Sequence, residues 1–273
     1  MDPETGLIVF GAAAMVAKKI LGPTAEYIGE GLQKWTEHRV HNVRRIFDNA
    51  ARKLGGEIDE EGAVPPRVLG RILDEGSYSA DAIATDYLGG ILASSRSGIS
   101  RDDRGVTFVA LVARLSAYEL RTHYILYAAG SRGLVGSTAN FGLSSDRDAT
   151  RLFLDMDVYQ EAMDLVETED LNLVLSHAIH GLKTAGLIDP WFGTGDTDTL
   201  RRQHRFIPSP GIIYQLSPLG IELFLWAHAL PNQNINHFLE GLSDRLETYT
   251  PIVIRSPAVK LAELPAIDTP APA

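Results

Sequence analysis

Apolar residues recur at helical spacing over most of the first hundred positions, and this periodicity predicts a mainly α protein. The spacing predicts a long amphipathic helix over Gln33–Leu54. It also predicts a short helix over Arg67–Glu75, which the chain enters through the extended segment Val64-Pro65-Pro66. A further helix, capped by Ser79, is expected to run to about Ser94. The first domain is therefore expected to be helical and to end in the polar, glycine-containing linker that follows.

A second pattern begins at Val106. Val106–Leu115 is apolar enough for a buried helix, and Ser116–Glu119 is a capping box that opens another helix. The stretch 130–148 is rich in Gly and Ser and predicts a flexible insertion. Arg151–Val166 again has helical spacing, so a helix is expected there.

The clearest helical pattern in the chain follows the cap Thr168-Glu169-Asp170 and ends at Gly186. Short strands are expected at Leu187-Ile188 and Gly211–Leu216, and a helix is expected to begin at Ser217-Pro218. The apolar face of the helix before the strands consists of Leu171, Val174, Leu175, Ala178, Ile179 and Leu182. Helices followed by a strand, a long loop, a strand and a helix are the order of a winged-helix-like module, in which the loop forms a short β-hairpin wing.

These patterns divide the chain into three parts. We expect a helical domain over residues 1–100 and a winged-helix-like domain over residues 106–230, with the insertion at 130–148. A terminal helix and a Pro- and Ala-rich tail are expected over residues 231–273. The last residues, 251–273, contain five prolines and are expected to be extended and poorly ordered.

Charge and cysteine content exclude several classes of function. The chain has 25 Lys and Arg against 35 Asp and Glu, a net charge of −10, whereas a general nucleic-acid coat needs the opposite sign. It has no cysteine and therefore no disulfide, thiolate zinc site or cysteine nucleophile.

An apolar run near the N-terminus, Gly6–Ala17, has 12 residues, fewer than the ~20 that a membrane-spanning helix needs. We expect a buried or partner-packed helix here. A membrane-surface anchor, with Lys18-Lys19 at the lipid headgroups, is the alternative. The expected location is the cytoplasm.

The expected wing and the helix before it supply the candidate contact residues, to a protein partner or to nucleic acid. The wing carries Arg201, Arg202, His204 and Arg205, which are of a kind that contacts phosphates. The exposed face of the helix carries His177, His180 and Lys183 but no arginine. Residues 150–273 hold 8 basic and 16 acidic side chains, which disfavours nucleic acid.

Other motifs resemble chemical sites only in part. His38/His41 and His177/His180 each share a helix face, but no third metal ligand is evident. The segment Leu152–Asp157 resembles the start of an aspartate-nucleophile phosphatase, which needs a parallel sheet that the pattern does not predict. We therefore expect no catalytic residues, no metal and no cofactor.

Two segments carry a resemblance to a known family. The first joins Ile20–Gly29, the helix at Val43-Arg44-Arg45-Ile46 and the Val64-Pro65-Pro66 turn, and the second is Asp86–Ala93 with the helix that begins at Leu115-Ser116. Together they resemble the Abi-alpha (abortive infection alpha) family of bacterial and phage-associated proteins. The resemblance covers roughly residues 15 to 128 and implies a role in the response to phage infection. It supplies no catalytic signature and no functional residues.

Together these observations predict a non-enzymatic phage-defence protein that acts by binding a partner, with a protein as the expected partner. The first alternative is a winged-helix regulator that binds nucleic acid. The second is a membrane-acting effector that uses the N-terminal apolar helix. A homo-oligomer is compatible with the sequence, which does not address it.

Overall fold

The computed structural model describes residue 19 and residues 37–79, 81–99, 101–204, 206–242 and 252–264. The protein is mostly helical, as the periodicity predicted, and has a small four-stranded antiparallel sheet in its C-terminal part. It forms two compact units. The N-terminal unit comprises residues 1–117 and 225–232, and the C-terminal unit comprises residues 118–224 and 233–273.

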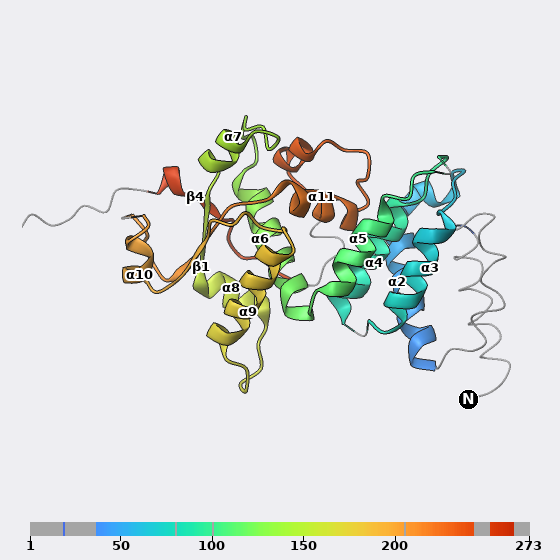
Figure 1. The fold of residues 1–273 in the computed structure, drawn as a ribbon, viewed down its shortest axis with the longest axis horizontal. Coiled ribbons are helices and arrows are strands. Elements are labelled where there is room, and N and C mark those ends of the chain that lie inside the picture. Colours follow the sequence, from blue (N-terminus) through green and yellow to red (C-terminus); the bar gives the residue numbers. More distant parts are fainter. Residues whose placement is uncertain are drawn as a thin grey trace, which may run out of the picture. The chain divides into compact units, whose positions relative to one another are not determined.

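The N-terminal unit is a group of helices (Figure 1). Its elements are α2 (Glu37–Leu54), the 3-10 helix η3 (Gly55–Asp59), α3 (Pro66–Ser77), α4 (Ala82–Ser94) and α5 (Gly105–Arg114). Helix α4 is its centre, because every residue from Ile83 to Ser94 is buried. The side chain of Asp81 caps α4 by accepting from the backbone N–H groups of Ile83 and Ala84. The predicted cap at Ser79 was wrong, since its hydroxyl donates to the Glu75 carbonyl.

A buried ion pair joins three segments of this unit. Lys53 Nζ donates to Asp86 Oδ2 at 2.7 Å, to the Asp86 carbonyl at 2.8 Å and to the Ala227 carbonyl at 2.7 Å. The Lys53 side chain is 0% exposed, and burial lowers its pKa although Asp86 acts in the opposite direction. Gly90 lies so close to Ala227 that an added Cβ would stand 1.9 Å from the Ala227 carbonyl oxygen. The segment 225–232 therefore contacts α2 through Lys53 and packs closely on α4 at Gly90.

The C-terminal unit combines helices with the sheet (Figure 1). Its helices are α6 (Ala117–Gly133, whose first residue belongs to the N-terminal unit), α7 (Ser144–Ala149), α8 (Met156–Met163), α9 (Leu171–Thr184), α10 (Thr197–Arg201), the part of α11 (Pro218–Ala227) up to Phe224, and the 3-10 helices η4 (Ile235–Glu240) and η5 (Leu261–Glu263). The strands are β1 (Leu152–Asp155), β2 (Gly193–Gly195), β3 (Gly211–Tyr214) and β4 (Val259–Lys260).

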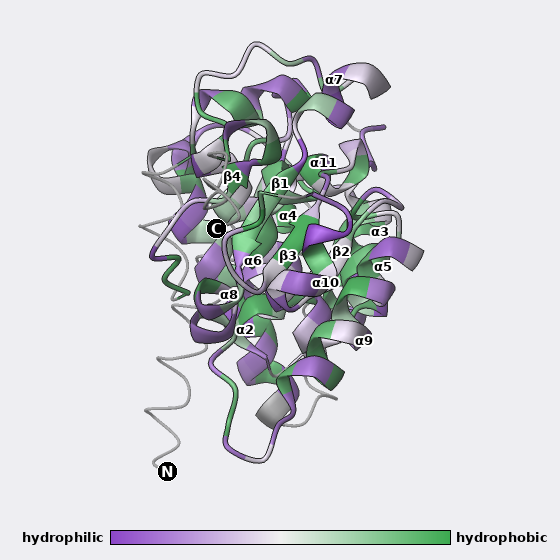
Figure 2. Ribbon diagram, turned by 90° about the vertical axis from the view of Figure 1, so that its left-hand side faces the viewer, coloured by the Kyte–Doolittle hydropathy of each residue, from purple (hydrophilic) through white to green (hydrophobic). Residues whose placement is uncertain are grey.

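The strands lie in the order β2-β3-β1-β4, and each neighbouring pair is antiparallel. Phe153 of β1 is in register with Ile213 of β3 on one side and with Val259 of β4 on the other. Figure 2 shows hydrophobic residues along β1 and β3, and the side chains of Phe153 and Ile213 are buried. The two inner strands, β1 and β3, therefore supply buried apolar side chains that stabilise the sheet.

Helix α6 runs through the core of the C-terminal unit and brings polar groups with it. Tyr127 donates to the Leu187 carbonyl at 2.6 Å, and Tyr214 donates to the Leu126 carbonyl at 2.8 Å. His123 stacks on Tyr127 with ring centroids 4.2 Å apart, and its Nε2–H donates to the Gly220 carbonyl at 3.2 Å. Burial lowers the pKa of His123 to about 3, so the ring is neutral near pH 7.

Three local predictions were wrong. Residues 152–155 form β1 rather than the first turn of a helix, and only Met156–Met163 is helical. The stretch 130–148 contains the end of α6, the start of α7 and the fully buried Phe141, so it is partly helical and is anchored in the core through Phe141. Residues 252–264 are not a loose tail, because β4 pairs with β1 and η5 follows it.

The boundaries of the two compact units differ from those of the expected domains, 1–100 and 106–230. Helix α5 packs against α3 and α4 and thus belongs with the helical unit rather than with residues 118–224. No helix among the described residues is long and apolar enough to cross a membrane. The apolar run Gly6–Ala17 lies outside the described residues.

Candidate partner-binding surface

Helix α9 separates an apolar face from a polar one. Asp170 caps it by accepting from the backbone N–H groups of Asn172 at 2.8 Å and Leu173 at 3.1 Å. Of the predicted apolar face, Val174, Leu175, Ala178, Ile179 and Leu182 are buried. Leu171 is only half-buried. The prediction of a buried ridge is therefore confirmed for five of its six residues.

The opposite face of α9 carries the three polar residues that the sequence singled out. His177, His180 and Lys183 are all exposed. The ring of His180 meets Phe192 edge-on with centroids 5.4 Å apart, and Lys183 Nζ lies 5.6 Å from the centroid of the same ring. His177 Nε2 lies 3.9 Å from the Glu119 carboxylate of α6. The second half of α9 thus lies beside Phe192, the residue that precedes β2.

A turn joins α8 to α9 and has a fixed shape. Asp164 ends α8 in the left-handed conformation with a φ of 51°. The Glu169 carboxylate then accepts from the Val166 N–H at 2.8 Å and from the Tyr118 hydroxyl. The hydrogen bond from Tyr118 lowers the pKa of Glu169 and raises that of Tyr118. The Glu169 carboxylate therefore stabilises the turn internally, through Val166, and connects the turn to α6, through Tyr118.

Two apolar side chains are strongly exposed at this end of α9. Val166 is 62% exposed and Leu173 is 72% exposed. Neither residue was singled out from the sequence as a surface feature. The only signal was that Leu173 lies outside the apolar stripe of α9.

The segment predicted as the wing loop contains β2 and α10, and α10 connects β2 to its antiparallel neighbour β3. The predicted strand at Leu187-Ile188 was wrong, since Ile188 forms only an isolated bridge with Leu216. Leu200 of α10 and Ile207 after it are fully buried against Phe153, Ile213 and Leu261. Because these apolar contacts anchor α10, its arginines extend from a defined surface.

The basic residues of the wing differ in their surroundings. Arg201 and Arg202 are exposed, and Arg201 Nε donates to the Ile207 carbonyl at 3.1 Å. His204 is half-buried, with its ring 5.7 Å from that of Phe206. Arg205 lies outside the described residues. The contacts in the structure thus place the candidate residues in two groups, one on α9 and one on and after α10.

The weaker motifs do not assemble into chemical sites. No group of three or more His, Asp or Glu side chains among the described residues is arranged to hold a metal. Strand β1 does end at Asp155, as an aspartate-nucleophile site requires, but its sheet is antiparallel. Asp155 is used instead as the cap of α8, accepting from the Asp157 N–H at 2.8 Å.

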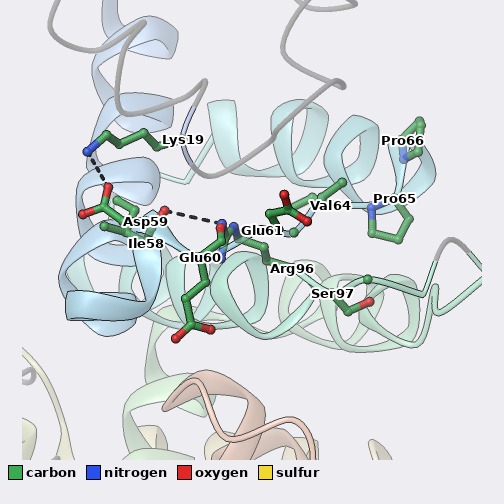
Figure 3. Close-up of a pocket in the computed structure, with 13 residues that line it drawn as sticks. Lys19, Ile58, Asp59, Glu60, Glu61, Val64, Pro65, Pro66, Arg96 and Ser97 are labelled. Carbon is green, nitrogen blue, oxygen red and sulfur yellow. Dashed lines mark hydrogen bonds and ion pairs between the residues drawn. The ribbon is translucent and has the colours of Figure 1, made fainter.

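An open hollow of about 840 Å³ lies in the N-terminal unit (Figure 3). The guanidinium of Arg96 donates to the carbonyls of Glu57 at 2.9 Å and Glu60, so this charge is occupied by main-chain oxygens. Lys19 Nζ pairs with Asp59 at 2.6 Å. The remaining carboxylates of the hollow belong to Glu60 and Glu61, which are exposed. Sequence reasoning did not single out this region.

Comparison with protein-family models, curated proteins and solved structures found no match for this chain.

Proposed function

We propose that this chain is a non-enzymatic binding protein whose C-terminal unit is a winged-helix-like module that recognises a protein partner through α9. The order of elements supports this proposal. A long helix, a short helix, a strand, two helices, a strand, a short helix and a strand follow one another as α6, α7, β1, α8, α9, β2, α10 and β3, with α10 in the place of the expected wing loop. The strand that follows the loop, β3, lies between β2 and β1, as it does in winged-helix modules. In this arrangement α9 stands where helix-turn-helix proteins carry their recognition helix.

The negative charge at the start of α9 favours a protein partner over nucleic acid. Recognition helices contact base edges with their N-terminal residues, beside the phosphate backbone. Here the residues before and at that end include Glu167, Glu169 and Asp170. Three carboxylates at the entry would be repelled by phosphates, while the exposed Leu173 next to them favours an apolar contact.

The setting that we propose is the response to phage infection. This part of the proposal depends on the resemblance of residues 15 to 128 to the Abi-alpha family. The structure supports the binding role through the exposed surface at the start of α9, whose preceding turn is held by the hydrogen bonds of Glu169.

Site-specific photo-cross-linking tests the proposal. A benzophenone amino acid at position 173 of the full chain would cross-link a protein in infected cells. The matched control is position 253, because Val253 is also 72% exposed and lies in the same unit. A protein cross-linked from position 173 and not from 253 supports the proposal. Cross-links to nucleic acid, or the same products from both positions, would contradict it.

Nucleic-acid binding through the wing remains the second candidate, and one observation favours it. Arg201 and Arg202 are both exposed on a hairpin that is anchored by buried side chains. If they contact phosphates, replacing both by alanine should weaken binding to a labelled DNA duplex in a fluorescence anisotropy titration. The loss should shrink as salt rises, since phosphate contacts release counterions. Binding that is absent, or unchanged in the variant, would remove this candidate.

A further inference from the structure

The turn between α8 and α9 and the first turn of α9 form a surface that we call the turn patch. It consists of two exposed apolar side chains, Val166 and Leu173, and three exposed acidic ones, Asp164, Glu167 and Asp170. Asp164 and Glu167 form no salt bridge within the part of the chain that the structure describes. The patch therefore combines exposed apolar side chains with two exposed carboxylates, Asp164 and Glu167, that form no salt bridge among the described residues.

The patch is held in one shape before any partner arrives. Glu169 bonds the Val166 N–H and Tyr118, and Asp170 bonds the first N–H groups of α9. Leu173 lies in the first turn of α9, which is packed through Val174 and Leu175. A surface that is already ordered loses less conformational entropy on binding than a mobile loop does.

These features define the chemistry of the partner. The apolar side chains gain from leaving water, so the partner must offer apolar surface for Val166 and Leu173. The unpaired carboxylates around them favour a partner whose apolar surface is bordered by Lys or Arg. We propose that the turn patch is the docking site for a protein segment that combines leucine-like and basic side chains, an amphipathic basic helix being the simplest form. This inference rests on the proposed function, because it names the class of protein partner for the same helix.

A second copy of this chain fits the patch poorly. In a twofold contact the same patch faces itself, so Asp164 and Glu167 of the two copies would repel each other. The chain as a whole is also acidic, with a net charge of −10. The partner is therefore expected to be a different, basic protein.

A designed peptide tests the inference on the full chain. The probe is a fluorescein-labelled helical peptide of Leu and Lys with leucines on one face, and a peptide with Glu in place of Lys is its control. Fluorescence anisotropy should report binding of the Leu/Lys peptide and not of the Leu/Glu peptide. Raising the salt concentration should weaken the binding, because exposed charges are screened over a Debye length that falls to about 3 Å at 1 M.

Variants assign that binding to the patch. Leu173→Ser removes an apolar contact, and Asp164→Asn with Glu167→Gln removes two charges; asparagine tolerates the left-handed conformation at position 164. Each change should weaken binding by about tenfold, as the loss of a contact residue does. The control, Asp157→Asn with Asp198→Asn, removes the same charge elsewhere in the unit and should leave affinity within about twofold.

The outcomes separate this inference from the proposed function. Equal loss in the patch and control variants would mean attraction to overall charge and would overturn the inference. Absence of peptide binding, together with a protein cross-linked from position 173, would leave the proposed function standing and overturn the basic-partner inference. Failure of both experiments would overturn both. Circular dichroism melting identifies any variant that does not fold. If a variant does not fold, the test is the binding of the Leu/Lys and Leu/Glu peptides to the unaltered chain. Equal binding of both peptides would contradict the inference.

Discussion

The buried pair of Lys53 and Asp86 gives the sharpest test of how the N-terminal unit is held together. Replacing Lys53 by methionine keeps an unbranched apolar side chain that lacks only the terminal ammonium group, and it removes three hydrogen bonds, two to Asp86 and one to the Ala227 carbonyl. The Asp86 side chain, 6% exposed, would keep only Arg52 as a charged partner, at 3.2 Å. Removing one partner of a buried pair costs roughly 3–5 kcal/mol. Because Arg52 remains, we expect a loss of about 3 kcal/mol.

The double variant Lys53→Met with Asp86→Leu separates the charge from the packing. It leaves no buried carboxylate, so it should be more stable than Lys53→Met by about 1–2 kcal/mol, the remaining cost coming from carbonyls without a donor. Arg67→Met is the surface control, since Arg67 and Asp103 form an exposed pair, and it should cost less than about 1 kcal/mol.

Urea denaturation followed by circular dichroism measures these free energies, and hydrogen exchange of residues 225–232 shows where the loss occurs. Faster exchange in that segment is expected for Lys53→Met, since the Ala227 carbonyl loses its donor. A loss below about 1 kcal/mol for Lys53→Met, or a double variant less stable than the single one, would refute the reasoning.

Three further predictions concern single positions. Gly90→Ala should destabilise by about 1–3 kcal/mol or more, because its Cβ meets the Ala227 backbone, whereas Gly70→Ala, with nothing within 4 Å, should stabilise by about 0.5–1 kcal/mol in the same urea titration. On folding, the pKa of His123 falls from an ordinary 6.5 to about 3. Between these values the unfolded chain binds more protons than the folded chain, so the free energy of unfolding must decrease as the pH is lowered. At pH 4.5 the free energy of unfolding should be lower than at pH 7 by about 2.7 kcal/mol because of His123. The variant His123→Phe should lack this contribution when its free energy of unfolding is measured at the same two pH values. Asp81→Ala removes the cap of α4 and should cost about 1 kcal/mol by thermal melting; an unchanged midpoint would contradict that role.

Helical periodicity was informative wherever one element packs along a continuous face. The apolar stripe of α9 was predicted because Val174, Ala178 and Leu182 recur at the spacing of helical turns and all point to the same core. Leu216, the last residue of the predicted strand Gly211–Leu216, is buried and forms a β-bridge with Ile188. Such a stripe needs no knowledge of the distant residues that cover it.

Strand β1 could not be found in this way, because its evidence is non-local. Its four residues are too few to show an alternation, and a short apolar run is compatible with a buried helix. The residues that make it a strand are Ile212 and Ile213 on one side and Val259 on the other. The same limit applied to residues 252–264, where β4 has only two residues and follows Pro257 closely.

The candidate surface was predicted in part. The exposure of His177, His180 and Lys183 follows from their position opposite the apolar stripe, and the structure has all three exposed. Their role as contacts stays a prediction. The turn patch was missed, because its shape depends in part on the hydrogen bond from Tyr118 to Glu169, which joins residues far apart in sequence.

The pairing of β1 with β4 has a consequence for the chain during its synthesis. Once β3 has emerged, β1 has a neighbour on one side only, and its other side waits for Val259 and Lys260. At roughly 5–20 residues per second, β4 emerges about 5–20 s after β1. Throughout that interval an unpaired strand with apolar side chains is open to other nascent chains, and a release of translation before position 259 would leave it permanently open. Strand β4 covers this edge of β1 at Leu152 and Phe153, the two residues with which it pairs.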